Sequence, residues 1–228
     1  MSKKWIIRTV AAAILVLAAL ITLSACGGGD DDGGDDGAGV TGVAEVSERF
    51  QGLPQSGQTV GEEGAAAEII EYGDLQCPFC ATSAETLNPQ IIDQIVKPGD
   101  ARLTFVPVAF IGPDSETGAL AVLAAANQDL TWNLTEILYA NQGDENSGWL
   151  SEDFARDAAA AAGLDLATFD EDFQADETVE ALFDSRERFT SDEGSGTPHY
   201  VVRGPNGQQI FPGQPTIEDL QQAVQEVG

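Results

Sequence analysis

Two cysteines separated by two residues are the strongest chemical signal in this chain. They are Cys77 and Cys80, within the segment EYGDLQCPFCATSAETL at residues 71–87. Such a pair can bind a metal ion, fasten the backbone as a structural disulfide, or exchange electrons with other thiols. The other residues available and the elements around the pair decide among these three kinds of chemistry.

The composition argues against the first two alternatives. A structural zinc site takes four Cys or His ligands. Beyond residue 26 the sequence offers only Cys77, Cys80 and one histidine, His199, so carboxylates would have to complete the set. A structural disulfide that closes so short a loop removes little chain entropy. We therefore expect a redox pair, with no metal and no organic cofactor.

Redox chemistry requires a stabilised thiolate, and the sequence places one cysteine at the start of a helix. The run AAAEIIEY at 65–72 predicts a strand, and the segment 78–96 has helical spacing that begins at Pro78. The free N–H groups and the dipole of a first helical turn favour an anion. We expect Cys77 to be the exposed attacking thiolate. Cys80, one turn further, is expected to be the more buried thiol that resolves the mixed disulfide.

The remaining elements are predicted in the order strand, helical block, hairpin, helix. Pro89 should break the first helix, and ARLTFVPVAF at 101–110 predicts a second strand, parallel to the first. The Ala-rich segment 113–193 predicts four or five helices. Two β-like runs, HYVVR and QQIF, flank a Gly-Pro-Asn-Gly turn at 204–207, and Thr216 is a plausible N-cap for a final amphipathic helix.

This arrangement resembles the DsbA-like thiol:disulfide oxidoreductases of the thioredoxin superfamily. The segment that carries the resemblance is Glu71-Tyr72-x-Asp74-x-x-Cys77-Pro78-Phe79-Cys80. Gly196-Thr197-Pro198 resembles the family's second hallmark, a residue followed by a cis-proline just before a strand. The resemblance implies an α/β thioredoxin fold over residues 61–228. Its helical insertion, at about 113–193, would separate a βαβ unit from a C-terminal ββα unit.

The resemblance also implies roles for individual residues. Pro198 would be cis and lie beside the cysteines, where the Thr197 backbone would let an extended client chain pair by strand addition. Glu71 takes the place of a buried acid that assists proton transfer at the resolving cysteine; a solvated carboxylate at a strand end is the alternative. Phe79 stands where the strongest oxidants carry a histidine. Because Phe cannot donate a hydrogen bond to the Cys77 thiolate, we expect a less extreme oxidant. Active-site support is therefore expected from Pro78, Phe79, Thr197 and Pro198.

The N-terminus predicts export and membrane attachment. Three basic residues precede an uncharged, mostly apolar run at 9–23, which is short for a membrane-spanning helix, although a transmembrane anchor is the alternative. Leu23-Ser24-Ala25-Cys26 resembles the lipobox of bacterial lipoproteins. This implies a signal peptide at 1–25 and a lipid on Cys26. The Gly- and Asp-rich stretch that follows predicts a tether over 26–60.

The formal net charge of −28 limits the partners. Nucleic acid is excluded because phosphate binding needs clustered Lys and Arg. The acidic residues are spread along the whole chain, which favours solubility through self-repulsion over the selection of basic clients.

Together these patterns predict an extracytoplasmic enzyme on the outer face of the cell membrane, or a secreted one if Cys26 is not acylated. It would transfer its Cys77–Cys80 disulfide to exported proteins with reduced cysteines, through a mixed disulfide on Cys77 that then resolves through Cys80. Regeneration would require a quinone-linked thiol oxidase in the membrane. Two alternatives remain: a reductase or isomerase of the same fold, and a non-catalytic, chaperone-like lipoprotein that binds clients.

Overall fold

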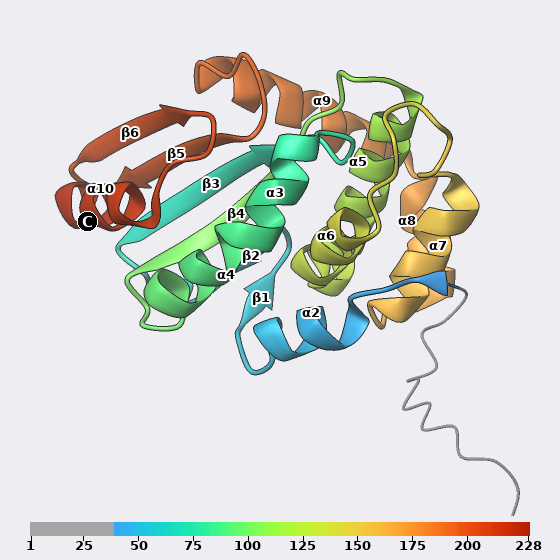
Figure 1. The fold of residues 1–228 in the computed structure, drawn as a ribbon, viewed down its shortest axis with the longest axis horizontal. Helices are drawn as coiled ribbons and strands as arrows, with labels where there is room; N and C mark the ends of the chain where they lie inside the picture. Colours follow the sequence, from blue (N-terminus) through green and yellow to red (C-terminus); the bar gives the residue numbers. More distant parts are fainter. Residues whose placement is uncertain (1–38) are drawn as a thin grey trace, which may run out of the picture. The chain divides into compact units, whose positions relative to one another are not determined.

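A six-stranded sheet organises the part of the chain that the computed structural model describes, residues 39–228 (Figure 1). The expected signal peptide, Cys26 and the first part of the tether lie outside these residues. The strand order is β1-β2-β4-β3-β5-β6, and only β3 and β4 are parallel. The strands are β1 (Gln55–Ser56), β2 (Thr59–Val60), β3 (Ala67–Gly73), β4 (Ala101–Pro107), β5 (His199–Gly204) and β6 (Gly207–Pro212).

The helices follow the predicted order, and the α/β thioredoxin fold with a helical insertion is confirmed. Before the insertion lie α2 (Val43–Phe50), α3 (Pro78–Thr86), α4 (Asn88–Ile91) and the π-helical η2 (Ile92–Val96). The insertion contains α5 (Pro113–Ala125), η3 (Ala126–Gln128), α6 (Thr131–Ala140), α7 (Glu152–Ala161), α8 (Leu166–Phe173) and α9 (Asp176–Ser191). The chain closes with α10 (Ile217–Val227), which Thr216 caps as predicted. Helix α3 ends at Thr86 and α4 begins at Asn88, so the predicted break at Pro89 is confirmed.

The main core lies on one face of the sheet. Residues of β3 alternate between the two faces, and Ala67 and Ile69 belong to the core that includes buried residues of α3, α4, α6 and α10. Because Glu71 follows Ile69 by two residues, its side chain points toward this same core. Ile70 and Tyr72 face the other way, into a smaller cluster against Phe189 of α9.

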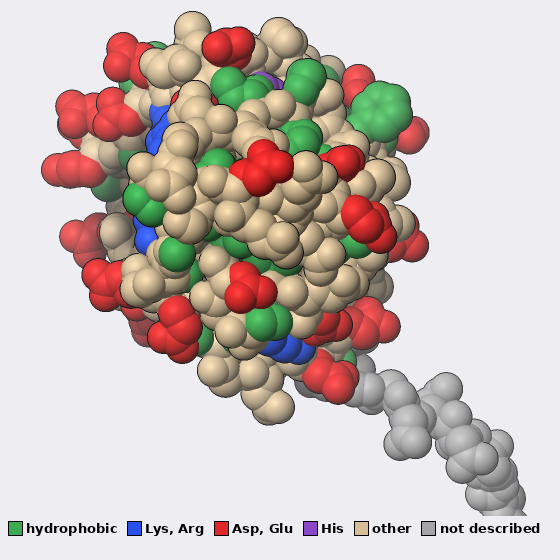
Figure 2. All heavy atoms as spheres, turned by 90° about the vertical axis from the view of Figure 1, so that its left-hand side faces the viewer, with side chains coloured by type: hydrophobic (Ala, Val, Ile, Leu, Met, Phe, Trp, Pro, Cys, Tyr) green, Lys and Arg blue, Asp and Glu red, His purple; other side chains and the backbone are tan. Residues whose placement is uncertain are grey.

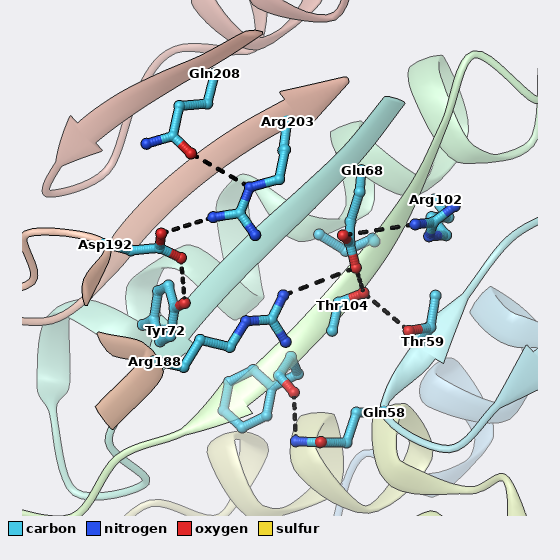
Figure 3. A network of polar contacts seen from close by, with 12 residues as sticks. Gln58, Thr59, Glu68, Tyr72, Arg102, Thr104, Arg188, Asp192, Arg203 and Gln208 are labelled. Atoms are coloured by element: carbon cyan, nitrogen blue, oxygen red, sulfur yellow. Dashed lines mark hydrogen bonds and ion pairs between the residues drawn. The ribbon is translucent and has the colours of Figure 1, made fainter. Parts of the chain in front are cut away.

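A network of polar contacts covers the second face of the sheet (Figure 3). The Asp192 carboxylate, just after α9, accepts a hydrogen bond from the Tyr72 hydroxyl at 2.5 Å and forms an ion pair with Arg203 at 2.6 Å. Glu68 accepts a hydrogen bond from Thr104 and forms an ion pair with Arg102. The Asp192 contacts join the end of the helical insertion to β3 and β5, and the Glu68 contacts join β3 to β4.

The segment 39–60, expected to be the end of a tether, belongs to the fold. Val46 and Phe50 lie one turn apart on α2 and are buried, and the Phe50 ring lies 6.1 Å from that of Trp132. Thr59 of β2 pairs with Thr104 of β4, which extends the sheet. The folded unit therefore begins upstream of the expected boundary at residue 61. The few apolar residues of this segment are separated by Gly, Gln and Glu, and this composition is why the segment was expected to be a tether.

No helix among residues 39–228 combines the length and apolar character that crossing a bilayer requires.

Candidate active site

The cysteine pair lies where β3 gives way to α3. Cys77 is the N-cap residue, with extended backbone angles (φ −72°, ψ 118°), and Pro78 occupies the first helical turn. The backbone N–H of Cys80 donates to the Cys77 carbonyl at 3.0 Å, so the two residues share one turn. Both cysteines are free thiols. The geometry is that of the dithiol form of a CxxC site at a helix N-terminus.

Cys77 carries the stabilised thiolate of the pair. Its pKa is lowered from 9.0 to about 6, chiefly by the hydrogen bond from the Cys80 side chain, with further hydrogen bonds from Thr197 and from the N–H groups of Cys80 and Phe79. Burial opposes this shift. Cys77 is only 5% exposed, which corrects the expectation of an exposed thiolate. The Cys77 thiol donates a hydrogen bond to the Thr197 carbonyl at 3.3 Å, whereas the neighbouring Phe79 side chain is 70% exposed.

The pKa of Cys80 is shifted in the opposite direction. Cys80 is fully buried, and burial followed by the interaction with Cys77 raises its pKa well above 9.0. At neutral pH one sulfur is therefore an anion and the other a thiol. The two pKa values therefore make Cys77 the nucleophile and Cys80 the residue that keeps its proton.

The second hallmark segment lies against the cysteines. The peptide bond between Thr197 and Pro198 is cis. Pro198 is buried, and its carbonyl accepts a hydrogen bond from the Gly213 N–H at 3.1 Å. Gly196 and Thr197 precede β5 and are not part of its pairing with β3 or β6. Their backbone is thus available for pairing with an extended chain next to Cys77.

Glu71 is a buried acid and not a solvated carboxylate at a strand end. It is fully buried, and neither carboxyl oxygen has a hydrogen-bond partner among residues 39–228. Burial and then the nearby charge of Glu136 raise its pKa from 4.5 to about 8, against the opposing effects of Tyr200 and Asn88. Glu71 in turn contributes to the raised pKa of Cys80. At neutral pH its carboxyl is therefore mainly protonated, and it can give or take a proton near the buried thiol.

Two residues without a predicted role hold the loop that carries Cys77. The Asp74 carboxylate accepts hydrogen bonds from the Gln76 N–H (2.9 Å), the Ser115 hydroxyl (2.6 Å) and the N–H groups of Phe110 and Ile111 (3.1 and 3.3 Å). The Gln142 amide donates to the carbonyls of Leu75 (2.8 Å) and Cys77 (3.1 Å). Asp74 belongs to the quoted motif, but three of its four partners, at positions 110, 111 and 115, lie about 40 residues further along the chain. Gln142 has no sequence signal.

Gly73 permits the close approach of helix α6 to this loop. A Cβ atom at this position would lie 2.5 Å from the Tyr139 hydroxyl and 2.7 Å from the Phe105 ring. The Tyr139 hydroxyl donates to the Asp74 carbonyl at 3.4 Å. A larger residue at 73 would push α6 away from the cysteine loop.

Metal ligands are not gathered anywhere in residues 39–228: no group of three or more His, Cys, Asp or Glu side chains there is arranged to hold an ion.

Comparison with known proteins agrees with this geometry. The thioredoxin family model matches residues 55–226. The probable disulfide bond formation protein D of Bacillus cereus is 28% identical over 151 residues, which cover 64% of this chain and 70% of that protein. Oxidised BdbD from Bacillus subtilis superposes with a TM-score of 0.66 at 20% identity, covering 76% of this chain and 95% of that one. DsbA from Chlamydia trachomatis gives 0.64 at 20% identity, covering 74% and 89%.

The chain belongs to the thioredoxin family and is a DsbA-like member of it. Its activity is that of a thiol:disulfide oxidoreductase.

Glu71→Gln is expected to remove a pH dependence of stability. In the wild type the folded state keeps a proton on Glu71 up to about pH 8, whereas the unfolded chain releases it near pH 4.5. The free energy of unfolding therefore falls as the pH rises through this window, by up to roughly 5 kcal/mol. Gln cannot titrate, so the variant should match the wild type near pH 4 and be more stable by several kcal/mol at pH 8.

Urea unfolding of the reduced proteins at pH 4, 6 and 8 measures this difference. Glu85→Gln, at an exposed position of α3, is the matched control and should follow the wild type. If Glu71→Gln kept the wild-type pH dependence, Glu71 would not be a protonated buried acid.

Proposed function

We propose that this protein is an extracytoplasmic oxidase that transfers its Cys77–Cys80 disulfide to exported client proteins. One observation carries the proposal. The pKa of Cys77 is lowered to about 6 while that of Cys80 is raised well above 9.0. A stabilised thiolate favours the dithiol form, and a disulfide that prefers to be reduced oxidises other thiols.

The reaction begins when a client thiolate attacks the Cys77 sulfur of the oxidised protein. The Cys77–Cys80 bond breaks, a client–Cys77 bond forms, and Cys80 leaves as a thiolate that takes up a proton. Glu71, mainly protonated at neutral pH, is the nearby donor. A second client thiolate then attacks the client sulfur of the mixed disulfide, and Cys77 leaves as a thiolate. Two electrons pass from the client to the cysteine pair.

The electron balance shows that Cys80 cannot resolve the client–Cys77 mixed disulfide during client oxidation, as was expected from the sequence. If Cys80 attacked the client–Cys77 disulfide, it would restore the protein's own disulfide and return the client to its reduced form. Resolution through Cys80 therefore belongs to regeneration. There the Cys77 thiolate attacks a disulfide of the regenerating partner, and Cys80 then attacks Cys77 and releases that partner in its reduced form. A quinone-linked thiol oxidase in the membrane is the partner that we propose.

Client binding would use the surface beside Cys77. Phe79 and Phe110 are 70% and 56% exposed, and the backbone of Gly196 and Thr197 is outside the sheet pairing. An extended client would pair with that backbone and bury apolar side chains against Phe79. This mode selects unfolded chains by their backbone and not by their sequence.

We further propose a signal peptide at 1–25, lipidation at Cys26 and a tether that ends before α2. A tether would hold the enzyme near a membrane oxidase and raise the frequency of their encounters. Asp and Glu side chains are spread over the face that Figure 2 shows, with few Lys or Arg among them. This even distribution supports a role of the charge in solubility more than in the choice of clients.

A direct test compares both directions of exchange. The oxidised protein, at one equivalent, should convert a reduced two-cysteine peptide to its disulfide within one turnover, while the reduced protein should reduce the same oxidised peptide poorly. The reverse preference would indicate a reductase or isomerase. Client binding with no exchange in either direction would indicate the chaperone-like alternative.

A further inference from the structure

His199 is the single histidine of the sequence, and the steps above give it no part. It begins β5 on the second face of the sheet and is only 1% exposed. Its ring packs between those of Tyr72 and Phe189, at centroid distances of 5.8 and 5.7 Å. A phenylalanine ring could make the same apolar contacts, so the buried ring nitrogens require an explanation beyond packing.

One of these nitrogens forms a hydrogen bond across the base of a loop. Nε2 of His199 lies 2.9 Å from the backbone carbonyl oxygen of Asp192, the first residue after α9. A carbonyl oxygen can only accept, so Nε2 carries a proton and donates. The other nitrogen, Nδ1, has no partner among residues 39–228. The bond to Asp192 is thus the polar contact that distinguishes this histidine from an apolar ring.

The loop closed by this bond, residues 193–197, has few other polar attachments. The N–H groups of residues 195–197 donate to no backbone carbonyl of residues 39–228. Near its end, the Thr197 carbonyl accepts a hydrogen bond from the Cys77 thiol at 3.3 Å. In the oxidised form Cys77 has no S–H to donate, so this attachment is lost. The bond from His199 is then the polar contact that closes the loop, in the form that receives the client.

The carbonyl to which the histidine ring donates has a fixed position. The Asp192 carboxylate accepts a hydrogen bond from Tyr72 at 2.5 Å and pairs with Arg203 at 2.6 Å, which attaches it to β3 and β5 (Figure 3). The Phe189 ring packs closely against the loop, since a Cβ atom at Gly194 would lie 2.1 Å from it. Both ends of the loop are therefore held on the same face of the sheet.

We infer that His199 is a positioning residue for client binding, which closes the loop onto Asp192 and holds the Thr197 backbone where an extended client can pair with it. The inference deepens the proposed function and rests on its strand-addition step. A loop that already has its bound conformation loses less conformational entropy when a client binds. If it has that conformation for only a fraction of the time, the apparent affinity falls by that fraction. His199 therefore acts on client affinity and not on the exchange of sulfur bonds.

The test compares an extended peptide with a small thiol, because only the peptide needs the loop. His199→Phe keeps an aromatic ring and removes the donor. Stopped flow follows oxidation of a reduced two-cysteine peptide by the oxidised full chain, over a range of peptide concentrations. The half-saturating concentration should rise about three- to tenfold, the factor that one net hydrogen bond contributes. The limiting rate, and the rate at which dithiothreitol reduces the protein, should stay within about twofold, because the leaving thiolate of Cys80 is unchanged.

A conservative variant and a matched control separate positioning from loss of stability. In His199→Gln the amide nitrogen lies the same number of bonds from the backbone as Nε2, so this variant should restore most of the peptide affinity. Thr104→Val removes a hydrogen bond to Glu68 on the same face of the sheet, and its peptide oxidation should equal that of the wild type. An unchanged half-saturating concentration in His199→Phe, or an equal loss of rate with peptide and dithiothreitol, would overturn the inference.

NMR order parameters of the backbone at residues 194–197 test the loop without a client. They should fall in oxidised His199→Phe and recover in His199→Gln, and unchanged values would overturn the inference. If His199→Phe does not fold, nitrogen NMR of the wild-type imidazole decides: a proton on Nε2 supports the inference, and a ring protonated only at Nδ1 refutes it. A wild type that dithiothreitol reduces but that does not oxidise the peptide would refute the proposed function, and the order parameters would still decide the role of His199.

Discussion

Cys77→Ser should reduce the rate of client oxidation to that of the peptide without protein. A serine hydroxyl can neither form the disulfide with Cys80 nor accept the client sulfur, so no step of the exchange remains. The measurement is oxidation of a reduced two-cysteine peptide by the oxidised protein, followed by thiol trapping. Cys26→Ser is the matched control: it removes the third cysteine of the chain and should leave the rate unchanged.

Cys80→Ser separates the roles of the two sulfurs. This variant keeps the Cys77 nucleophile but has no thiol to resolve an adduct, so it should accumulate a mixed disulfide with a peptide whose single cysteine is disulfide-bonded to glutathione. The adduct is visible by mass spectrometry and should map to Cys77. Peptide oxidation at the wild-type rate by Cys77→Ser, or an adduct on a residue other than Cys77, would contradict the assignment.

Asp74→Ala should cost about 2–6 kcal/mol of folding free energy and impair exchange as well. The substitution leaves four donors without their acceptor, of which the Gln76 N–H and the Ser115 hydroxyl are buried, and each such loss costs about 1–3 kcal/mol. The freed loop carries Cys77, whose N–H donates to the Asp74 carbonyl at 2.9 Å. The pKa of Cys77 should therefore rise from about 6 toward 9.0 as the helix-start geometry loosens.

Chemical unfolding and the pH dependence of thiolate absorbance measure these two effects. Asp93→Ala is the control, because Asp93 is exposed and only forms an ion pair with Lys97, so stability should change by less than about 0.5 kcal/mol. Asp74→Asn should also be destabilised, since its amide group would face N–H or O–H donors. Wild-type stability and an unchanged Cys77 pKa in Asp74→Ala would show that Asp74 does not position the loop.

Local patterns in the sequence were sufficient for the order of elements and for the cysteine pair. Pro89 marks the break between α3 and α4, and Thr216 caps α10, because helix termini depend on a few neighbouring residues. A short element around residues 45–50 was expected within the tether, where α2 lies, but strands β1 and β2 were missed because their residues pair only after folding, with each other and with β4. Local propensity carries little information about such contacts.

The chemistry of the site was predictable in part. The burial of Glu71 was within reach, since it follows Ile69 at the two-residue period of a strand facing the core. Its pKa was not, because it depends first on complete burial in the folded core and then on the charge of Glu136, 65 residues further along the chain. Gln142 likewise acquires its role only when α6 packs against the cysteine loop. Contacts between side chains that lie far apart in the sequence can be identified only from the folded structure.

The equilibrium reduction potential of the Cys77–Cys80 couple tests the central claim most directly. At pH 7 a Cys77 pKa of about 6 stabilises the dithiol by about 1.4 kcal/mol, or 30 mV, relative to an ordinary thiol. We predict a value between about −200 and −120 mV by glutathione titration, which is above the value of thioredoxin and below that of the strong oxidant DsbA. A potential near −270 mV would mean a stable disulfide and would contradict the account.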